Sequence, residues 1–298
     1  MKKIVWLPVI IMILIAVTGM QSCKNSDASA GSVLKFNLEK DKRYDYEIIW
    51  DMDQKVMDKD SKINLLAGYS FEVTDEKDNI KTLRGVYHNF RLYMKIMDME
   101  IDIDTEKPVE NTTGDDQMAI MKKLFTGIKG KAFTMKVDEE GKVLSVSGFD
   151  EIIKGMIDSS GVNEDMKLQM RASLQDQFNE QELKNQFAQV FMIFPGKMVK
   201  VGDSWQKNYR MGGKTPANFS TTYTVKKMEA GQVLLDAKTA IASAGGETEV
   251  TGTQTGTLLV DGKNGLVIDA EFNQDMDAKM KDFSIKINGR GKIRGKER

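Results

Sequence analysis

Cysteine is almost absent from the chain, since Cys23 is the only one among its 298 residues. No disulfide can form within the chain, so an exported fold must be stable without one. Histidine is equally scarce, and the single His88 lies in a predicted strand next to Tyr87. Zinc sites need several cysteine or histidine ligands, and a Ser-His-Asp site would have to use this one histidine. We interpret His88 as a surface or strand-edge residue, which argues against both kinds of site.

The chain also lacks an excess of charge of one sign: it has 43 basic and 44 acidic residues, and its net charge is −1 at pH 7. Nucleic-acid-binding surfaces depend on a basic excess, so no nucleic-acid partner is expected. No P-loop, dinucleotide-binding fingerprint or GxSxG elbow occurs in the sequence. The basic C-terminal segment GRGKIRGKER is expected to be a solvated, frayed terminus. The sequence therefore predicts no cofactor and a protein that is not an enzyme.

The N-terminus contains a targeting pattern. Two lysines precede a short apolar run, which is too short to span a membrane comfortably and is typical of a secretory signal peptide. The residues Met-Gln-Ser-Cys that end at Cys23 resemble a lipobox, in which a signal peptidase cuts before a lipid-modified cysteine. We therefore predict a lipoprotein signal peptide over residues 1–22 and lipidation of Cys23. An ordinary secreted protein with one stray cysteine is the alternative.

A lipid on Cys23 would place the protein in the cell envelope, anchored to a membrane, with the outer membrane as the expected location and either its periplasmic or its surface face possible. Residues 23–32 are mostly small and polar, without periodicity, and are predicted to be a flexible tether. The membrane is thus the first expected partner.

Residues 33–298 are predicted to form one α+β domain. Apolar and polar residues alternate through 33–104 and 218–294, which is typical of strands with one buried face. Tight turns between neighbouring strands favour antiparallel pairing. The middle, about 115–194, is helical and contains a β-hairpin at 131–147. We predict a large curved antiparallel β-sheet, open or half-barrel-like, with the central helical segment packed on one face.

Two smaller features of the pattern are specific. Apolar residues recur every four positions up to Phe178 and again from Leu183, so the helix should break between them. The segment VGDSW should form a turn at Gly202 and re-enter a strand at Trp205.

Four acidic side chains share one face of a predicted strand: Asp98, Glu100, Asp102 and Asp104. Calcium takes oxygen ligands, so these residues are candidates for a metal site. Ligands must converge on the ion, however, whereas these side chains project in a row. We prefer the interpretation of a solvated strand face and predict no metal site.

Two segments resemble a known family. These are KAFTMKVDEEGKVLSVSGFDEII, which contains the predicted hairpin, and FPGKMVKVGDSWQ, with helices that bear methionine and phenylalanine between them. The combination resembles a family of bacterial lipoproteins of unknown function, over residues 35–290. The resemblance implies export and an α+β fold, but no activity, substrate or catalytic residue.

Three hypotheses for the function follow. The first is a non-enzymatic, lipid-anchored envelope protein that binds a lipid-like ligand or another envelope protein. The second is an envelope hydrolase that uses carboxylates or a metal. The third is a purely structural or assembly lipoprotein.

Overall fold

The structure is a computed structural model that describes residues 31–56, 59–96, 99–108, 117–212, 215–246, 248–281 and 284–298. The predicted signal peptide, Cys23 and most of the predicted tether lie outside the described residues. Strands make up 58% of the described residues and helices 19%, so the fold is a large sheet with a smaller helical part.

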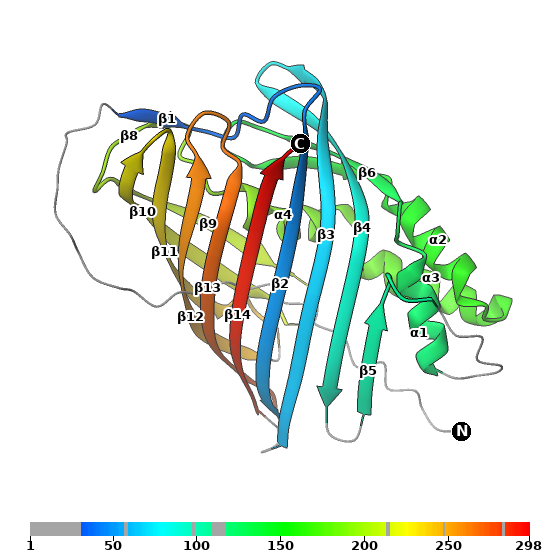
Figure 1. The fold of residues 1–298 in the computed structure, drawn as a ribbon. Coiled ribbons are helices and arrows are strands. Elements are labelled where there is room, and N and C mark those ends of the chain that lie inside the picture. Colours follow the sequence, from blue (N-terminus) through cyan, green and yellow to red (C-terminus); the bar gives the residue numbers. More distant parts are fainter. Residues whose placement is uncertain are drawn as a thin grey trace.

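One antiparallel sheet of 12 strands forms the body, and it curls without closing (Figure 1). The order is β7-β6-β4-β3-β2-β14-β13-β12-β11-β10-β9, with β5 paired to β4. Two short strands, β1 and β8, form a separate ribbon. The strand bounds are β1 Ser32–Leu34, β2 Arg43–Val56, β3 Lys59–Lys77, β4 Ile80–Ile96, β5 Met99–Asp104, β6 Ala132–Val137, β7 Val143–Ser147, β8 Lys197–Val199, β9 Ser204–Met211, β10 Ala217–Glu229, β11 Gln232–Ser243, β12 Glu249–Asp261, β13 Val267–Lys279 and β14 Ser284–Glu297.

Alternation along the strands decides which side chains face the interior. On β2, Tyr44, Tyr46, Ile48 and Trp50 are buried, whereas the residues between them are only partly covered. Successive strands repeat this pattern, so one face of the sheet is mostly apolar. A twisted sheet of this width curls, and the apolar face becomes the lining of a half-barrel.

The helices are α1 Gln117–Thr126, α2 Phe149–Ser160, α3 Glu164–Gln177 and α4 Glu180–Phe191. The predicted break between Phe178 and Leu183 is confirmed. There the side chain of Asn179 caps α4 by accepting a hydrogen bond from the backbone N–H of Glu182 at 3.0 Å. Helices α1 to α3 gather beside β5 and β6 (Figure 1).

Helix α4 lies in the opening of the half-barrel, where it contacts the strands at both ends of the sheet order, β7 and β9. Its carboxylate at Glu182 accepts a hydrogen bond from the Gly212 N–H at 3.2 Å, just after β9. Trp205 on β9 donates its indole N–H to the Ile193 carbonyl at 2.8 Å, just after α4. The helix therefore fills the gap that the strands leave open.

Residues 35–42, which we call the strap, cross one end of the half-barrel between β1 and β2 (Figure 1). The apolar side chains Leu34, Phe36 and Leu38 are at most 2% exposed and point into the interior. Gly265, in the turn between β12 and β13, has a φ of 76°, and a Cβ there would lie 2.4 Å from the Lys35 carbonyl oxygen. The strap thus packs directly on that turn.

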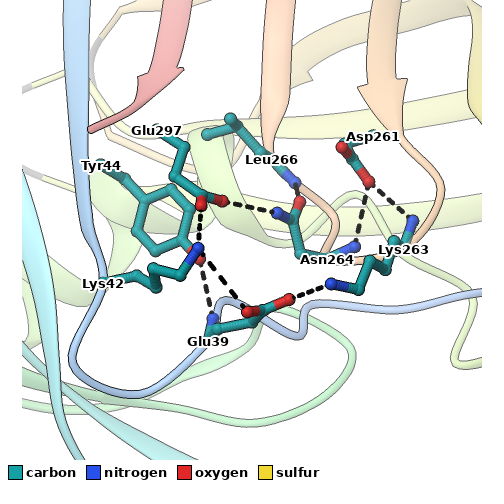
Figure 2. A network of polar contacts seen from close by, with 8 residues as sticks. All are labelled: Glu39, Lys42, Tyr44, Asp261, Lys263, Asn264, Leu266 and Glu297. Atoms are coloured by element: carbon teal, nitrogen blue, oxygen red, sulfur yellow. Dashed lines mark hydrogen bonds and ion pairs between the residues drawn. The ribbon is translucent and has the colours of Figure 1, made fainter.

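Polar contacts hold the strap in place (Figure 2). Glu39 donates its N–H to the Tyr44 hydroxyl at 2.9 Å, and its carboxylate pairs with Lys263. Lys42 pairs with Glu297 near the end of β14. The strap therefore joins the turn between β12 and β13 to the ends of β2 and β14.

The predicted fold class is confirmed, with one correction at the C-terminus. The segment GRGKIRGKER does not fray, because all but its last residue belongs to β14, which pairs with both β13 and β2. Glycine and isoleucine face inward there, and the basic residues face outward. A Cβ at Gly291 would lie 2.8 Å from the Trp50 ring, so this glycine makes room for the indole. Strands also resume earlier than residue 218, with β8 and β9.

Candidate functional site

A row of polar side chains crosses the apolar inner face of the sheet. Register pairing joins Thr221 on β10 to Thr239 on β11, Thr239 to Gln254 on β12, and Gln254 to Gln274 on β13. None of the four is more than 7% exposed. We call these four residues the inner polar row.

The row is only partly satisfied by hydrogen bonds. The two threonine hydroxyls lie 2.8 Å apart, but the side-chain oxygens of Gln254 and Gln274 have no hydrogen-bond partner among the described residues. The nitrogen of Gln274 reaches only the sulfur of Met276, a weak acceptor, at 3.4 Å. An unsatisfied buried polar group costs about 1–3 kcal/mol, so these atoms destabilise the fold as it stands.

Trp50 extends the row toward β2. Its indole N–H is buried and also has no partner among the described residues. A Cβ at Gly289 would lie 3.4 Å from the Trp50 ring and 3.6 Å from the Gln274 side-chain oxygen, so the two side chains are neighbours. The row and the indole together present one free donor and two free acceptors to the interior.

A cavity of about 20 Å³ lies between the inner polar row and α4. Its polar lining comes from Gln189, Tyr209, Thr221, Tyr223, Thr239 and Gln254, and the rest is apolar. A space of this size holds about one water molecule. In this conformation, side chains of α4 therefore occupy the space beside the row.

Among the described residues, no charged side chain lines this cavity. Burial raises the pKa of the Tyr209 and Tyr223 hydroxyls, so both remain protonated at neutral pH. A buried charge needs a partner, and the site offers none, so its chemistry suits an uncharged polar group with apolar surroundings.

His88 lies on the outer face of the sheet and does not line the cavity beside the inner polar row. Its Nε2 is 2.8 Å from the Ser70 hydroxyl and 2.9 Å from the Arg43 guanidinium. A guanidinium only donates, so Nε2 accepts and carries no proton. Burial first, and then the nearby Arg43 charge, lower the pKa of His88.

Ser70, His88 and Asp45 have the composition of a catalytic triad but not its geometry. Asp45 pairs with Arg43 and Arg298, and within the described residues no carboxylate is hydrogen-bonded to His88. Ser70 is only 4% exposed, so its hydroxyl is out of reach of a substrate. These contacts make His88 part of an ion-paired surface beside an outer groove of about 440 Å³.

The acidic strand corresponds to β5, with Asp98 outside the described residues. Asp102 and Asp104 lie 3.9 and 3.8 Å from the Lys107 ammonium, and Glu100 is exposed. Within the described ranges, no three histidine, cysteine or acidic residues are grouped so that they could hold a metal ion. The structure therefore does not bring these carboxylates together around one point.

Sequence reasoning missed the inner polar row, although a signal was present. On β12 the threonines from Thr251 to Thr257 form the outer face, which leaves Gln254 at an inward position among apolar neighbours. A glutamine at such a position is unusual, and Gln274 repeats it on β13.

No helix in the described part of the chain is long and apolar enough to cross a membrane.

Comparisons with known proteins give a family and distant structural likenesses. The model of a family of unknown function (DUF6263) matches residues 78–267, more than half of the chain. No curated protein sequence matches. Among solved structures, lipovitellin is similar with a TM-score of 0.49 and 9% identity, and the match covers 87% of this chain but only 25% of lipovitellin.

The β domain of the Bordetella autotransporter BrkA has a TM-score of 0.25 at 9% identity, covering 85% of this chain and 98% of that one. A Rhodopseudomonas blastica porin mutant has a TM-score of 0.20 at 7% identity, covering 85% and 99%. These scores are too low to support any argument about function.

Proposed function

The chain belongs to the DUF6263 family, whose function is unknown, and we propose that it is a non-enzymatic, lipid-anchored envelope protein that binds a hydrophobic ligand inside its half-barrel. The anchor is the predicted lipid on Cys23, in the outer membrane. The ligand has an apolar body and one uncharged polar group, such as a long-chain alcohol or amide.

The inner polar row carries this proposal. Its free acceptors at Gln254 and Gln274 lie on paired residues of neighbouring strands, the ring of Trp50 lies beside Gln274, and both acceptors and the Trp50 indole N–H are buried. A hydroxyl or amide on the ligand both donates and accepts, so it would satisfy these atoms, while the apolar lining would surround the chain. A carboxylate would bring an unpaired charge and should bind more weakly.

Entry of such a ligand requires α4 to move. The helix lies against the interior mainly through apolar side chains, among them Phe187 and Phe191. Non-directional contacts of this kind can be replaced by a ligand's apolar chain without leaving buried polar groups unpaired. We therefore place the ligand between α4 and the row.

Binding can be tested by titrating the purified full chain with a fluorescently labelled long-chain alcohol and with the matching fatty acid. The double variant Gln254→Leu/Gln274→Leu removes both free acceptors. Each lost hydrogen bond is worth about 1 kcal/mol, so the pair should weaken alcohol binding by roughly tenfold or more. Thr253→Val, on the outer face of the same strand, is the matched control and should leave the affinity unchanged. No binding of either probe to the wild-type protein would refute the proposal.

The anchor has its own test. Cys23→Ser should leave an unprocessed precursor and prevent labelling by a fatty-acid probe in cells. Normal processing of this variant would make the protein a merely secreted one, without affecting the ligand proposal.

A further inference from the structure

Exposed apolar side chains gather at one place on the surface. Four large hydrophobic residues of the described part are exposed, and three of them are Val33 at 46%, Met198 at 65% and Val201 at 50%. Val33 and Met198 are direct partners in the ribbon of β1 and β8, and Val201 follows β8 by two residues. Single exposed apolar residues are common, but a cluster of them marks an interaction site. We call these three residues the ribbon patch.

Basic residues flank the ribbon patch. Lys197 and Lys200 lie on either side of the Met198–Val199 pair, and both are exposed. Neither is ion-paired with a residue that the structure describes. The nearby Asp203 uses its carboxylate to accept the Lys200 backbone N–H at 3.0 Å. Apolar side chains beside free lysines are typical of surfaces that bind anionic lipid.

The ribbon patch lies close along the chain to Cys23, the predicted site of the lipid anchor. Strand β1 begins at Ser32, nine residues after Cys23. Nine residues span at most about 30 Å when fully extended. A lipid on Cys23 would therefore keep the ribbon within that distance of the bilayer.

We infer that the ribbon patch rests on the membrane that holds the acyl chains of Cys23, with the lysines on anionic headgroups and the three apolar side chains in the interfacial region. The strap continues directly from β1, so this contact turns the strap-covered end of the half-barrel toward the bilayer. The inference rests on the proposed anchor but not on the proposed ligand.

The test uses the mature, membrane-extracted protein reconstituted into vesicles of phosphatidylethanolamine and phosphatidylglycerol. Acylation turns the Cys23 sulfur into a thioether, so an added cysteine is the only free thiol. Met198→Cys carries an environment-sensitive fluorophore. Leu168→Cys on α3 is the matched control, because Leu168 is 66% exposed in the native chain. Brominated lipids quench a fluorophore that lies in the membrane interface, so the loss of fluorescence shows which of the two labels is there.

We expect quenching at position 198 to be several-fold stronger than at position 168, and to weaken when phosphatidylglycerol is replaced by phosphatidylcholine. Replacing Val33 and Val201 by serine in the protein labelled at position 198 should also reduce the quenching of that label. Equal quenching at both positions, on protein whose Cys23 is acylated by mass spectrometry, overturns the patch alone. A free Cys23 thiol overturns the anchor and the patch together. Excimer formation between labels at 198 without lipid quenching would show that the patch joins two copies of the chain, which also overturns the inference.

Discussion

Removing the Phe36 side chain should destabilise the whole half-barrel, although Phe36 lies in a segment without regular secondary structure. The ring is 2% exposed, and its centroid lies 5.4 Å from that of Phe191 and 6.1 Å from that of Phe194. Phe→Ala substitutions in cores cost about 3–5 kcal/mol, from the lost burial and the cavity left behind. We expect Phe36→Ala to lower the free energy of unfolding by this amount.

Unfolding in urea, followed by tryptophan fluorescence, measures this loss. Trp50 is fully buried on the inner face and should report the opening of the interior. Val33→Ala, three residues earlier and 46% exposed, is the control and should change stability by less than about 0.5 kcal/mol. A loss below about 1 kcal/mol for Phe36→Ala would refute the view that the strap is docked in the core.

A second variant approaches the same contact from the opposite side. Gly265→Ala places a methyl group against the Lys35 carbonyl, at a backbone φ of 76° that favours glycine. If both substitutions act by displacing the strap, the double variant should lose less stability than the two single losses added together. Simple additivity would mean that the two sites act independently.

Three further predictions concern the interior, the outer surface and α4. Gln254→Leu/Gln274→Leu should raise the urea midpoint while it weakens ligand binding, because it removes unsatisfied buried polar atoms worth about 1–3 kcal/mol each; a lower midpoint would show that these atoms are satisfied in solution. The lowered pKa of His88 means that folding disfavours its protonation, so stability should fall as pH drops from the usual histidine pKa, about 6.5, through the lower folded value. His88→Gln should flatten that part of a curve of stability against pH. An unchanged slope would show that His88 is not the cause of this pH dependence. Asn179→Ala should cost about 1 kcal/mol through the lost cap, measurable by thermal melting, with Asn185→Ala in the middle of the same helix as the control.

The sequence predicted those features that depend on local periodicity. Alternation identified the strands, and the phase change after Phe178 located the boundary between α3 and α4. It also placed Gly202 in a turn and Trp205 in a strand, as observed. The family resemblance is confirmed by the match over residues 78–267, whereas the lipid on Cys23 and the location stay predictions.

Features that depend on distant partners were not predicted. The frayed terminus predicted for GRGKIRGKER overlooked its pairing with β2, and the Trp50 ring on that strand explains the inward Gly291. The inner polar row needs the register of four strands, which no local pattern contains. Alternation assigns a residue to a face but does not reveal what lies beside it on the next strand.

The pairing of β2 with β14 has a consequence for biosynthesis. Strand β2 pairs with β3, which follows it directly, on one side and with the distant β14 on the other, so the pairing in the middle of the sheet cannot form until β14 has been made. Until β14 is present, Trp50 and the apolar strands around it stay uncovered and prone to aggregate. Truncation before β14 should therefore abolish folding, because it removes the strand that joins β2 to β13.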